Sequence, residues 1–469
     1  MSDTAAWIDA FWDDHIVPTI TDYIRIPNKS PAFDPDWEAN GHMERVLQMA
    51  LAWVEEHALP GQTVTVGRLP GRTPLILVDV PGQGEGSVLM YGHLDKQPEF
   101  VGWREGLGPW EPVMSDDGKL YGRGGADDGY ALFASYAALH ALQRRGTPHA
   151  RAVILIEFCE ESGSGDLDAY FEHFADVIGT PDLVVALDSG AGNYEQLWST
   201  TSLRGMASGI LRVDVLDEGV HSGDASGIVP DSFRVARRLL DRIEDAATGE
   251  VTVPACHVDI PSDRVEQAGR AADFLGDAVW QRFPWAGPTK PISTDRVTAI
   301  LARTWRPSVT VTGADGLPAT GSAGNVLRTH TSLKLSVRLP PTCDSEPALA
   351  AIAAALEGDA PHDAKVTFQR HDTANGWEAP ALAPWLASAL DAVSERWYGK
   401  PAVHMGEGGT IPFMGMLSDA FPDAQFVITG VLGPNSNAHG PNEFLHVPYA
   451  KKLTGCVADL LALHAEHLA

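Results

Sequence analysis

Histidine, aspartate and glutamate side chains gather at the ends of the apolar segments of this sequence, and such side chains can bind metal ions or transfer protons. They are, in chain order, His93 and Asp95 after Ser87–Tyr91, Asp127 and Asp128 before a helix-like segment, Glu160 and Glu161 after Arg151–Phe158, Asp188 after Leu183–Leu187, and His439 after Gln425–Thr429. In an open α/β sheet, ligands bind beyond the carboxyl ends of the strands. We therefore expect these side chains to meet in one cleft.

The chemistry of this group favours a metal site. Many carboxylates in one cleft repel one another unless cations neutralise them. Two histidines with three or four carboxylates and no thiolate suit a pair of divalent metal ions such as Zn²⁺, Mn²⁺ or Co²⁺. Two such ions, roughly 3.5–4 Å apart, can hold a water and polarise a carbonyl, while one carboxylate outside the metal shell acts as general base. The adjacent Glu160 and Glu161 suit this division, because neighbouring side chains of an extended segment point to different sides.

Each motif taken alone has a simpler interpretation. A Gly-His-x-Asp sequence is commonly a turn, a Glu-Glu pair is usually solvated, and Asp-Asp before a helix commonly caps it. The shared position of the motifs at strand ends is what favours the metal site.

The elements that must position these residues alternate between strand and helix. The apolar segments are continuous, as in strands buried on both faces. Strands are predicted at Leu75–Val80, Ser87–Tyr91, Arg151–Phe158 and Leu183–Leu187, and helices at Trp7–Ile20, Met43–Val54 and Asp128–Arg145. The last helix would be capped by Asp127 or Asp128 and stopped by Gly146. This order predicts an α/β fold with a mixed, largely parallel sheet flanked by helices.

The pattern changes near Gly205. Strands with one exposed face are predicted at Met206–Val215 and Leu333–Arg338, helices at Asp231–Ala247 and Ser345–Leu356, and a last strand at Val366–Gln369. This order resembles a split βαβ unit, an α+β ferredoxin-like arrangement. After Pro380 the first pattern returns, with a helix to Tyr398, a strand at Gln425–Thr429 and a closing helix from Pro448. We therefore predict a catalytic domain over residues 1–204 and 379–469, interrupted by an inserted domain over 205–378.

Composition excludes several classes of protein. The 469 residues carry a net charge of −28, which repels nucleic-acid phosphate and anionic lipid. Cys159, Cys256, Cys343 and Cys456 lie far apart, so we expect buried apolar fillers and neither a disulfide scaffold nor a thiolate zinc site. The sequence has no signal-peptide pattern and no apolar run near the ~18 residues of a membrane span. These features predict a soluble, cytoplasmic protein with no nucleic-acid or membrane partner.

At these residues the sequence resembles the dinuclear metallopeptidase family of carnosine dipeptidases, aminoacylases and glutamate carboxypeptidases, and most of all its cytosolic non-specific dipeptidase and carnosinase branch. The resemblance covers nearly the whole chain. It is carried by Tyr91–Asp95, Tyr121–Gly124 with Asp127-Asp128, Glu160–Ser164, Leu203–Gly205, His221–Gly223, Gly406–Pro412 and Ala438-His439. The sequence departs from the branch in two ways. A lysine often follows the Asp-Asp pair shortly in the branch, where this chain has Gly129-Tyr130, and an arginine often precedes Glu-Gly-Gly, where this chain has Gly406.

The resemblance implies a role for each residue. His93 and Asp188 would hold one metal ion, Glu161 and His439 the other, and Asp127 would bridge the two. Glu160 would be the general base and Asp95 would orient His93. The peptide between Asp127 and Asp128 would be cis. His221 would reach into the partner's active site across a homodimer, Asn325 and Arg338 would hold substrate oxygens, and Glu407 and Thr410 would add contacts.

The expected enzyme is thus a zinc-exopeptidase-like hydrolase with an inserted lid or dimerisation domain and two divalent metal ions per subunit, zinc before manganese or cobalt. It would cleave an amide bond beside a free carboxylate, as a dipeptidase does. An N-acyl-amino-acid amidohydrolase with the same metal site is the first alternative. A binding protein without catalysis is a weaker one, because such proteins usually lose ligands and every expected ligand is present.

Overall fold

The computed structural model describes residues 3–411 and 413–469, which form two compact units. The first unit comprises Met1–Thr201, Ala379–Met405 and Met416–Ala469, and the second comprises Ser202–Glu378 and Gly406–Gly415. All of 379–469 is predicted to belong to one domain, whereas Gly406–Gly415 belongs to the second unit.

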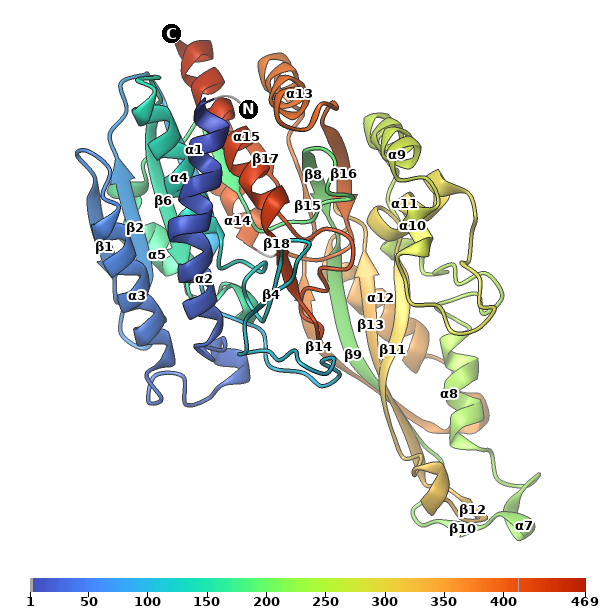
Figure 1. The fold of residues 1–469 in the computed structure, drawn as a ribbon. Coiled ribbons are helices and arrows are strands. Elements are labelled where there is room, and N and C mark those ends of the chain that lie inside the picture. Colours follow the sequence, from blue (N-terminus) through green and yellow to red (C-terminus); the bar gives the residue numbers. More distant parts are fainter. Residues whose placement is uncertain (1–2, 412) are drawn as a thin grey trace. The chain divides into compact units, whose positions relative to one another are not determined.

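A mixed sheet with a parallel centre organises the first unit (Figure 1). Strands β6, β3, β7 and β17 are parallel, and β1, β2 and β8 add antiparallel neighbours at the two sides in the order β1-β2-β6-β3-β7-β17-β8. The strands are β1 (Thr63–Gly67), β2 (Leu75–Val80), β3 (Ser87–His93), β6 (Arg151–Glu157), β7 (Leu183–Ala186), β8 (Trp198–Leu203), β16 (Val403–Glu407), which pairs with β8, and β17 (Gln425–Ile428). The predicted α/β class is confirmed, and the central strands are buried along almost their whole length, as continuous apolar runs predict.

Helices pack around this sheet and on one another. They are α1 (Asp3–Phe11), a π-helical turn (Trp12–Ile16), α2 (Val17–Ile24), α3 (His42–Glu56), α4 (Ala131–Arg144), α5 (Leu167–His173), α6 (Ala175–Ile178), α13 (Pro384–Tyr398), α14 (Phe413–Ala420) and α15 (Val447–Leu468). The long α15 packs against α4, α13 and α1, and α4 packs on β3. A small sheet of β4 (Val113–Met114), β5 (Lys119–Tyr121) and β18 (Phe444–His446) completes the unit.

One predicted cap is wrong. Helix α4 begins at Ala131 with Tyr130 at the N-cap position and no side-chain cap. Asp128 is fully buried instead, and its Oδ2 accepts a hydrogen bond from the His93 backbone N–H at 3.3 Å. The carboxylate therefore fixes the strand end that carries His93.

The second unit is built on an antiparallel sheet with the order β11-β13-β9-β14 (Figure 1). Its elements are β9 (Gly205–Asp214), β10 (Val220–His221), α7 (Ser222–Ala225), α8 (Ser232–Leu240), α9 (Ser262–Leu275), α10 (Ala278–Gln281), α11 (Arg296–Thr304), β11 (Ser308–Asp315), β12 (Val326–Leu327), β13 (His330–Leu339), α12 (Ser345–Glu357), β14 (Lys365–Ala374) and β15 (Trp377–Glu378). Alternate residues of β9 and β13 join α8 and α12 in one core, which explains their period-two pattern.

The helix predicted over Asp231–Ala247 ends earlier, at Leu240. Its start is as predicted, because the Asp231 side chain accepts from the Arg234 N–H at 2.7 Å. Beyond Leu240 the Arg242 guanidinium donates to the Ala355 and Asp359 carbonyls near the end of α12, at 3.1 and 2.8 Å. Long-range contacts therefore turn the chain away from the helical path.

All four cysteines are free and buried, as predicted. In the described part of the chain no helix has the length and apolar character of a membrane span.

Candidate metal centre

The parallel strands of the first unit place the predicted ligands at one edge of the sheet. His93 is the last residue of β3, Glu160 and Glu161 form a 3₁₀ turn just after β6, and Asp188 lies two residues beyond β7. Asp127 lies in the loop before α4, and its peptide bond to Asp128 is cis. His439 comes from the loop between β17 and β18.

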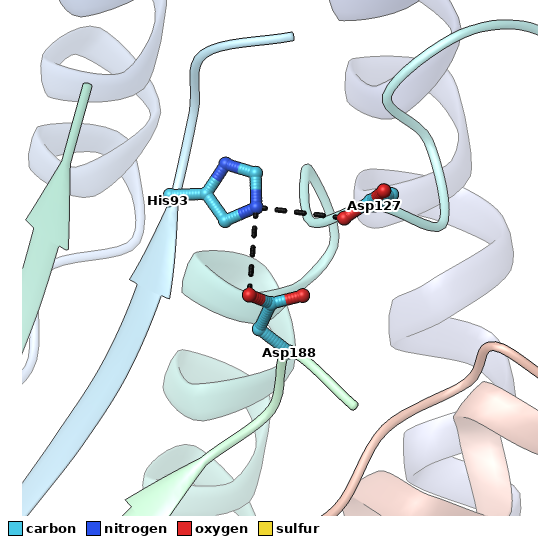
Figure 2. A group of neighbouring side chains, drawn as sticks. All are labelled: His93, Asp127 and Asp188. Carbon is cyan, nitrogen blue, oxygen red and sulfur yellow. Dashed lines mark ion pairs between the residues drawn. The ribbon is translucent and has the colours of Figure 1, made fainter. Parts of the chain in front are cut away.

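The Asp127 carboxylate lies between the two histidines. Its Oδ1 is 3.6 Å from His93 Nε2, and its Oδ2 is 3.1 Å from His439 Nε2. Asp188 Oδ2 lies 3.8 Å from His93 Nε2, and Figure 2 shows both carboxylates facing this ring nitrogen. On the other side, Glu161 Oε2 lies 3.3 Å from His439 Nε2. The arrangement forms two ligand groups that share Asp127.

Glu160 lies beside the first of these groups. Its Oε2 is 3.9 Å from His93 Nε2, and its side chain is 12% exposed, against 2% for that of Glu161. Three sets of side chains hold ligand atoms within 4.8 Å of one another: His93 with Asp127 and Asp188, His93 with Glu160 and Glu161, and Asp127 with Glu161 and His439. Glu160 therefore lies near enough to the ligands to exchange a proton with a water held between them.

The donor atoms of these residues suit divalent cations. His93 Nε2, Asp127 Oδ2 and Glu161 Oε1 are buried and make no hydrogen bond with any of the described residues. Buried polar atoms in proteins are normally hydrogen-bonded, so three such atoms in one place call for a further partner. Imidazole nitrogen and carboxylate oxygen without thiolate are the ligands that zinc, manganese and cobalt accept.

Burial and crowding shift the proton affinities of the site. Burial raises the pKa of Glu160 and of Glu161 well above the ordinary value, and Asp188 and Asp127, respectively, raise them further. Burial also raises the pKa of Asp188 to about 6, against the opposing charge of His93. For His93, burial lowers the pKa, but the Asp127 and Asp95 carboxylates outweigh it and raise the pKa well above the usual range. Without a cation, the site therefore holds protons that metal binding would displace.

Asp95 connects the histidine with the glutamate turn. Its Oδ1 lies 3.3 Å from His93 Nδ1 and accepts from the Glu160 N–H at 3.1 Å, while its Oδ2 accepts from the Glu161 N–H at 3.0 Å. One fully buried carboxylate thus fixes both the ring of a ligand and the backbone of the two glutamates.

Several residues that hold the ligands are not among those predicted from the sequence. Gln97 Nε2 donates to Glu161 Oε2 at 2.6 Å. Arg123 Nη2 donates to the His439 and Gly440 carbonyls at 3.2 and 2.8 Å, and its Nη1 donates to Glu443 Oε2 at 2.6 Å. The position of Gln97 two residues after Asp95 is a weak signal, but nothing in the sequence pairs Arg123 with Glu443.

The remaining predicted residues belong to the second unit and lie in two groups, His221 with Asn325 and Arg338 with Glu407 and Thr410. His221 is exposed at the end of β10, which pairs with β12, and the Asn325 carbonyl accepts from the Ser222 N–H at 3.0 Å. Arg338 Nη1 donates to Thr410 Oγ1 at 2.9 Å. Glu407, three residues before Thr410, has its Oε2 3.5 Å from Nη1 of Arg303 on α11. Pro412, the last residue of that motif, lies outside the described residues.

The model of Peptidase family M20/M25/M40 matches residues 89–463. A cysteinylglycine-S-conjugate dipeptidase from Corynebacterium striatum is 27% identical over 381 residues, which are 78% of this chain and 79% of the relative. The human Beta-Ala-His dipeptidase is 24% identical over 478 residues, covering 96% of this chain and 91% of the relative.

A solved structure of the di-peptidase Dug1p from Saccharomyces cerevisiae superposes with a TM-score of 0.79 at 19% identity, covering 99% of this chain and 98% of that one. This likeness shows that the fold is shared.

Proposed function

Because this chain belongs to Peptidase family M20/M25/M40, we propose that it is a metal-dependent dipeptidase that hydrolyses the amide bond of small substrates with a free carboxylate. The observation that carries this proposal is the position of Asp127, whose two oxygens face His93 and His439 at 3.6 and 3.1 Å. The dipeptidase names of both curated relatives favour this activity over an N-acyl-amino-acid amidohydrolase.

The ligand distances support a dinuclear site. His93 and Asp188 would hold one ion, Glu161 and His439 the other, with Asp127 bridging, and zinc is the first expectation before manganese or cobalt. When bound, such ions polarise the scissile carbonyl and lower the pKa of the attacking water. The chain's own contribution is to hold the ligands in place. Asp95 and Asp128 contact His93, Gln97 donates to Glu161, and Arg123 donates to the His439 carbonyl.

Glu160 is proposed as the general base. Its carboxylate would accept a proton from the attacking water and then return it to the nitrogen of the leaving amine. One feature supports this role over that of a ligand: its side chain is 12% exposed, against 2% for that of Glu161, so it is more accessible to a water. Asp95, through the Glu160 N–H, would keep the turn in place during the transfer.

Residues of the second unit are proposed to bind the substrate. His221 Nδ1 accepts from the Gly223 N–H at 3.1 Å, which leaves the proton on Nε2 to donate to a carbonyl oxygen or an oxyanion. Arg338 and Asn325 would hold substrate oxygens, with Arg338 paired to the terminal carboxylate, and Glu407 and Thr410 would add contacts. We further propose a homodimer in which His221 serves the partner's site, with 205–378 as the lid and dimerisation domain of the catalytic domain 1–204 and 379–469.

The four free, buried cysteines support a reducing compartment, and we propose the cytoplasm.

The test is hydrolysis by the full chain after chelation and reloading with Zn²⁺, Mn²⁺ or Co²⁺. A dipeptide panel is assayed beside the N-acetyl forms of the same C-terminal residues. We expect the dipeptides to be cleaved in preference. Cleavage of the N-acetyl compounds alone would make the chain a deacylase, and cleavage of neither class under any metal would refute the proposal.

A further inference from the structure

A contact between two serines connects the turn Glu160–Ser162 with the N-terminal part of the first unit. Ser162 is the last residue of this turn, and its Oγ lies 2.5 Å from Ser30 Oγ. The same Ser162 oxygen accepts a hydrogen bond from the Ala32 N–H at 2.9 Å. We call these two interactions of Ser162 the serine contact. Its residues all belong to the first unit, as the proposed metal ligands do.

The segment that carries Ser30 lies along the chain just after His93. The Asn28 Nδ2 donates to the Leu94 carbonyl at 2.5 Å, and the Ser30 N–H donates to the Lys96 carbonyl at 2.9 Å. Ser30 is itself fully buried. The serine contact therefore joins the glutamate turn to a segment that is fixed against the strand end of His93.

The turn needs such a contact because it is weakly held by itself. A 3₁₀ turn of three residues has internal hydrogen bonds of poor geometry. Gly163, which follows the turn, is exposed, and a Cβ atom there would meet nothing within 4 Å. Asp95 holds the beginning of the turn through the Glu160 and Glu161 N–H groups. The serine contact holds its end, so the two together fix the direction in which the turn presents its side chains.

The two glutamates of the turn depend on this direction to different degrees. The Glu161 carboxylate is held directly, because Gln97 Nε2 donates to its Oε2 at 2.6 Å and His439 Nε2 lies 3.3 Å from the same oxygen. Glu160 Oε2 lies 3.9 Å from His93 Nε2, which is beyond hydrogen-bond distance. The position of Glu160 therefore follows from its backbone, whereas that of Glu161 is fixed at the carboxylate as well.

We infer that Ser162 and Ser30 are positioning residues for the general base, and that they act on Glu160 through the backbone of the turn. This inference rests on the proposed function, in which Glu160 accepts the proton of the attacking water. Proton transfer requires donor and acceptor within hydrogen-bond reach, so a shift of about 1 Å in the turn slows turnover by up to about a hundredfold. Metal binding is affected less, because Gln97 still holds Glu161.

The first test is Ser162→Ala, assayed on a dipeptide that the zinc-loaded wild type cleaves. We expect kcat to fall by about tenfold to a hundredfold, while KM and the affinity for Zn²⁺ change by less than about twofold. Ser30→Ala should lower kcat less, because the Ala32 N–H still binds Ser162. The matched control is Ser394→Ala, which removes a buried hydroxyl that accepts from the Leu197 N–H at 3.1 Å and should leave kcat unchanged.

A combined variant separates positioning from general damage to the site. In the Glu160→Gln background the base is already lost, so Ser162→Ala should lower the residual turnover no further. A further loss, by the same factor as in the protein that retains Glu160, would overturn the inference, and so would an unchanged kcat in Ser162→Ala. A loss of Zn²⁺ affinity equal to the loss of turnover would also overturn it, since Ser162 would then act on Glu161. The dipeptidase proposal stands in each of these cases.

Hydrogen exchange gives a measurement that does not depend on turnover. In the metal-free protein, the amides of residues 160–163 should exchange about twofold to tenfold faster in Ser162→Ala than in wild type, as the loss of one hydrogen bond predicts. Ser394→Ala should leave these amides unchanged, and equal exchange in wild type and Ser162→Ala would overturn the inference. If wild type cleaves no dipeptide, the dipeptidase proposal fails, and the exchange rates alone decide whether the serine contact holds the turn.

Discussion

The buried ion pair between Arg123 and Glu443 should be essential for both stability and the position of His439. Arg123 is 1% exposed and Glu443 fully buried, with 2.6 Å between Nη1 and Oε2. Glu443 Oε1 also accepts from the Gly124 N–H at 2.9 Å. The other end of the guanidinium holds the His439 and Gly440 carbonyls. His439 has a side chain that is 57% exposed, so packing fixes it weakly and its backbone anchor matters more.

Glu443→Ala removes both carboxylate contacts and leaves the guanidinium buried without its partner. Breaking a buried pair in this way costs about 3–5 kcal/mol of unfolding free energy. The loop that carries His439 loses its anchor, and loss of such a supporting contact weakens metal binding by about 10–100-fold. Urea unfolding gives the first quantity, and competition with a chelator gives the second.

The matched control is Glu195→Ala, which removes an exposed ion pair with Lys400 in the same unit and should cost less than about 1 kcal/mol. Equal stability of the two variants would show that the buried pair contributes little. Unchanged metal affinity in Glu443→Ala would show that Arg123 does not position His439.

Three further predictions concern the reaction and the proton balance of the site. Glu160→Gln should keep its metal and lose about 10²–10⁴-fold in turnover, because the proton acceptor is gone, whereas a parallel loss of metal would make Glu160 a ligand. The metal-free protein should lose stability as pH rises from about 4 to about 6. The pKa of Asp188 is raised to about 6 in the folded chain, so the folded chain binds this proton more tightly than the unfolded chain does. The stabilisation is therefore full below the pKa of the unfolded chain, about 4, and is lost as pH rises through the pKa of the folded chain. At about 1.36 kcal/mol per pKa unit, unfolding curves at several pH values should show that the free energy of unfolding falls by about 3 kcal/mol. The fall should be smaller in Asp188→Asn, and the same pH dependence in this variant and in wild type would contradict the assignment. His221→Ala should bind metal normally and lose about 10²–10³-fold in turnover, and mixing it with Glu160→Gln should restore activity if His221 acts across a dimer; heterodimers that stay inactive would exclude that role.

The sequence predicts the framework of the site because its signals there are local. Continuous apolar runs mark the central strands, and β3, β6 and β7 end where the motifs begin. The period-two pattern of β9 and β13 likewise follows from burial of one face.

The features that were missed depend on contacts between distant parts of the chain. Asp128 has the sequence position of a helix cap, yet it binds the His93 N–H because the chain folds back onto β3. Arg123 and Glu443 are 320 residues apart, so neither helical nor strand periodicity can pair them. Helices α9, α10 and α11 are also absent from the prediction, although the buried residues of α9 recur with helical spacing at Arg264, Ala268, Ala271 and Ala272.

Titration of the metal-free chain with Zn²⁺, with bound metal and dipeptide hydrolysis followed together, tests whether this chain is a metal-dependent dipeptidase with two ions held around Asp127. We expect two ions per chain, hydrolysis that rises with metal occupancy, and loss of metal in Asp127→Ala, because this carboxylate faces both histidines. Full hydrolysis by a chain verified to be free of metal, or undiminished binding of both ions by Asp127→Ala, would contradict it.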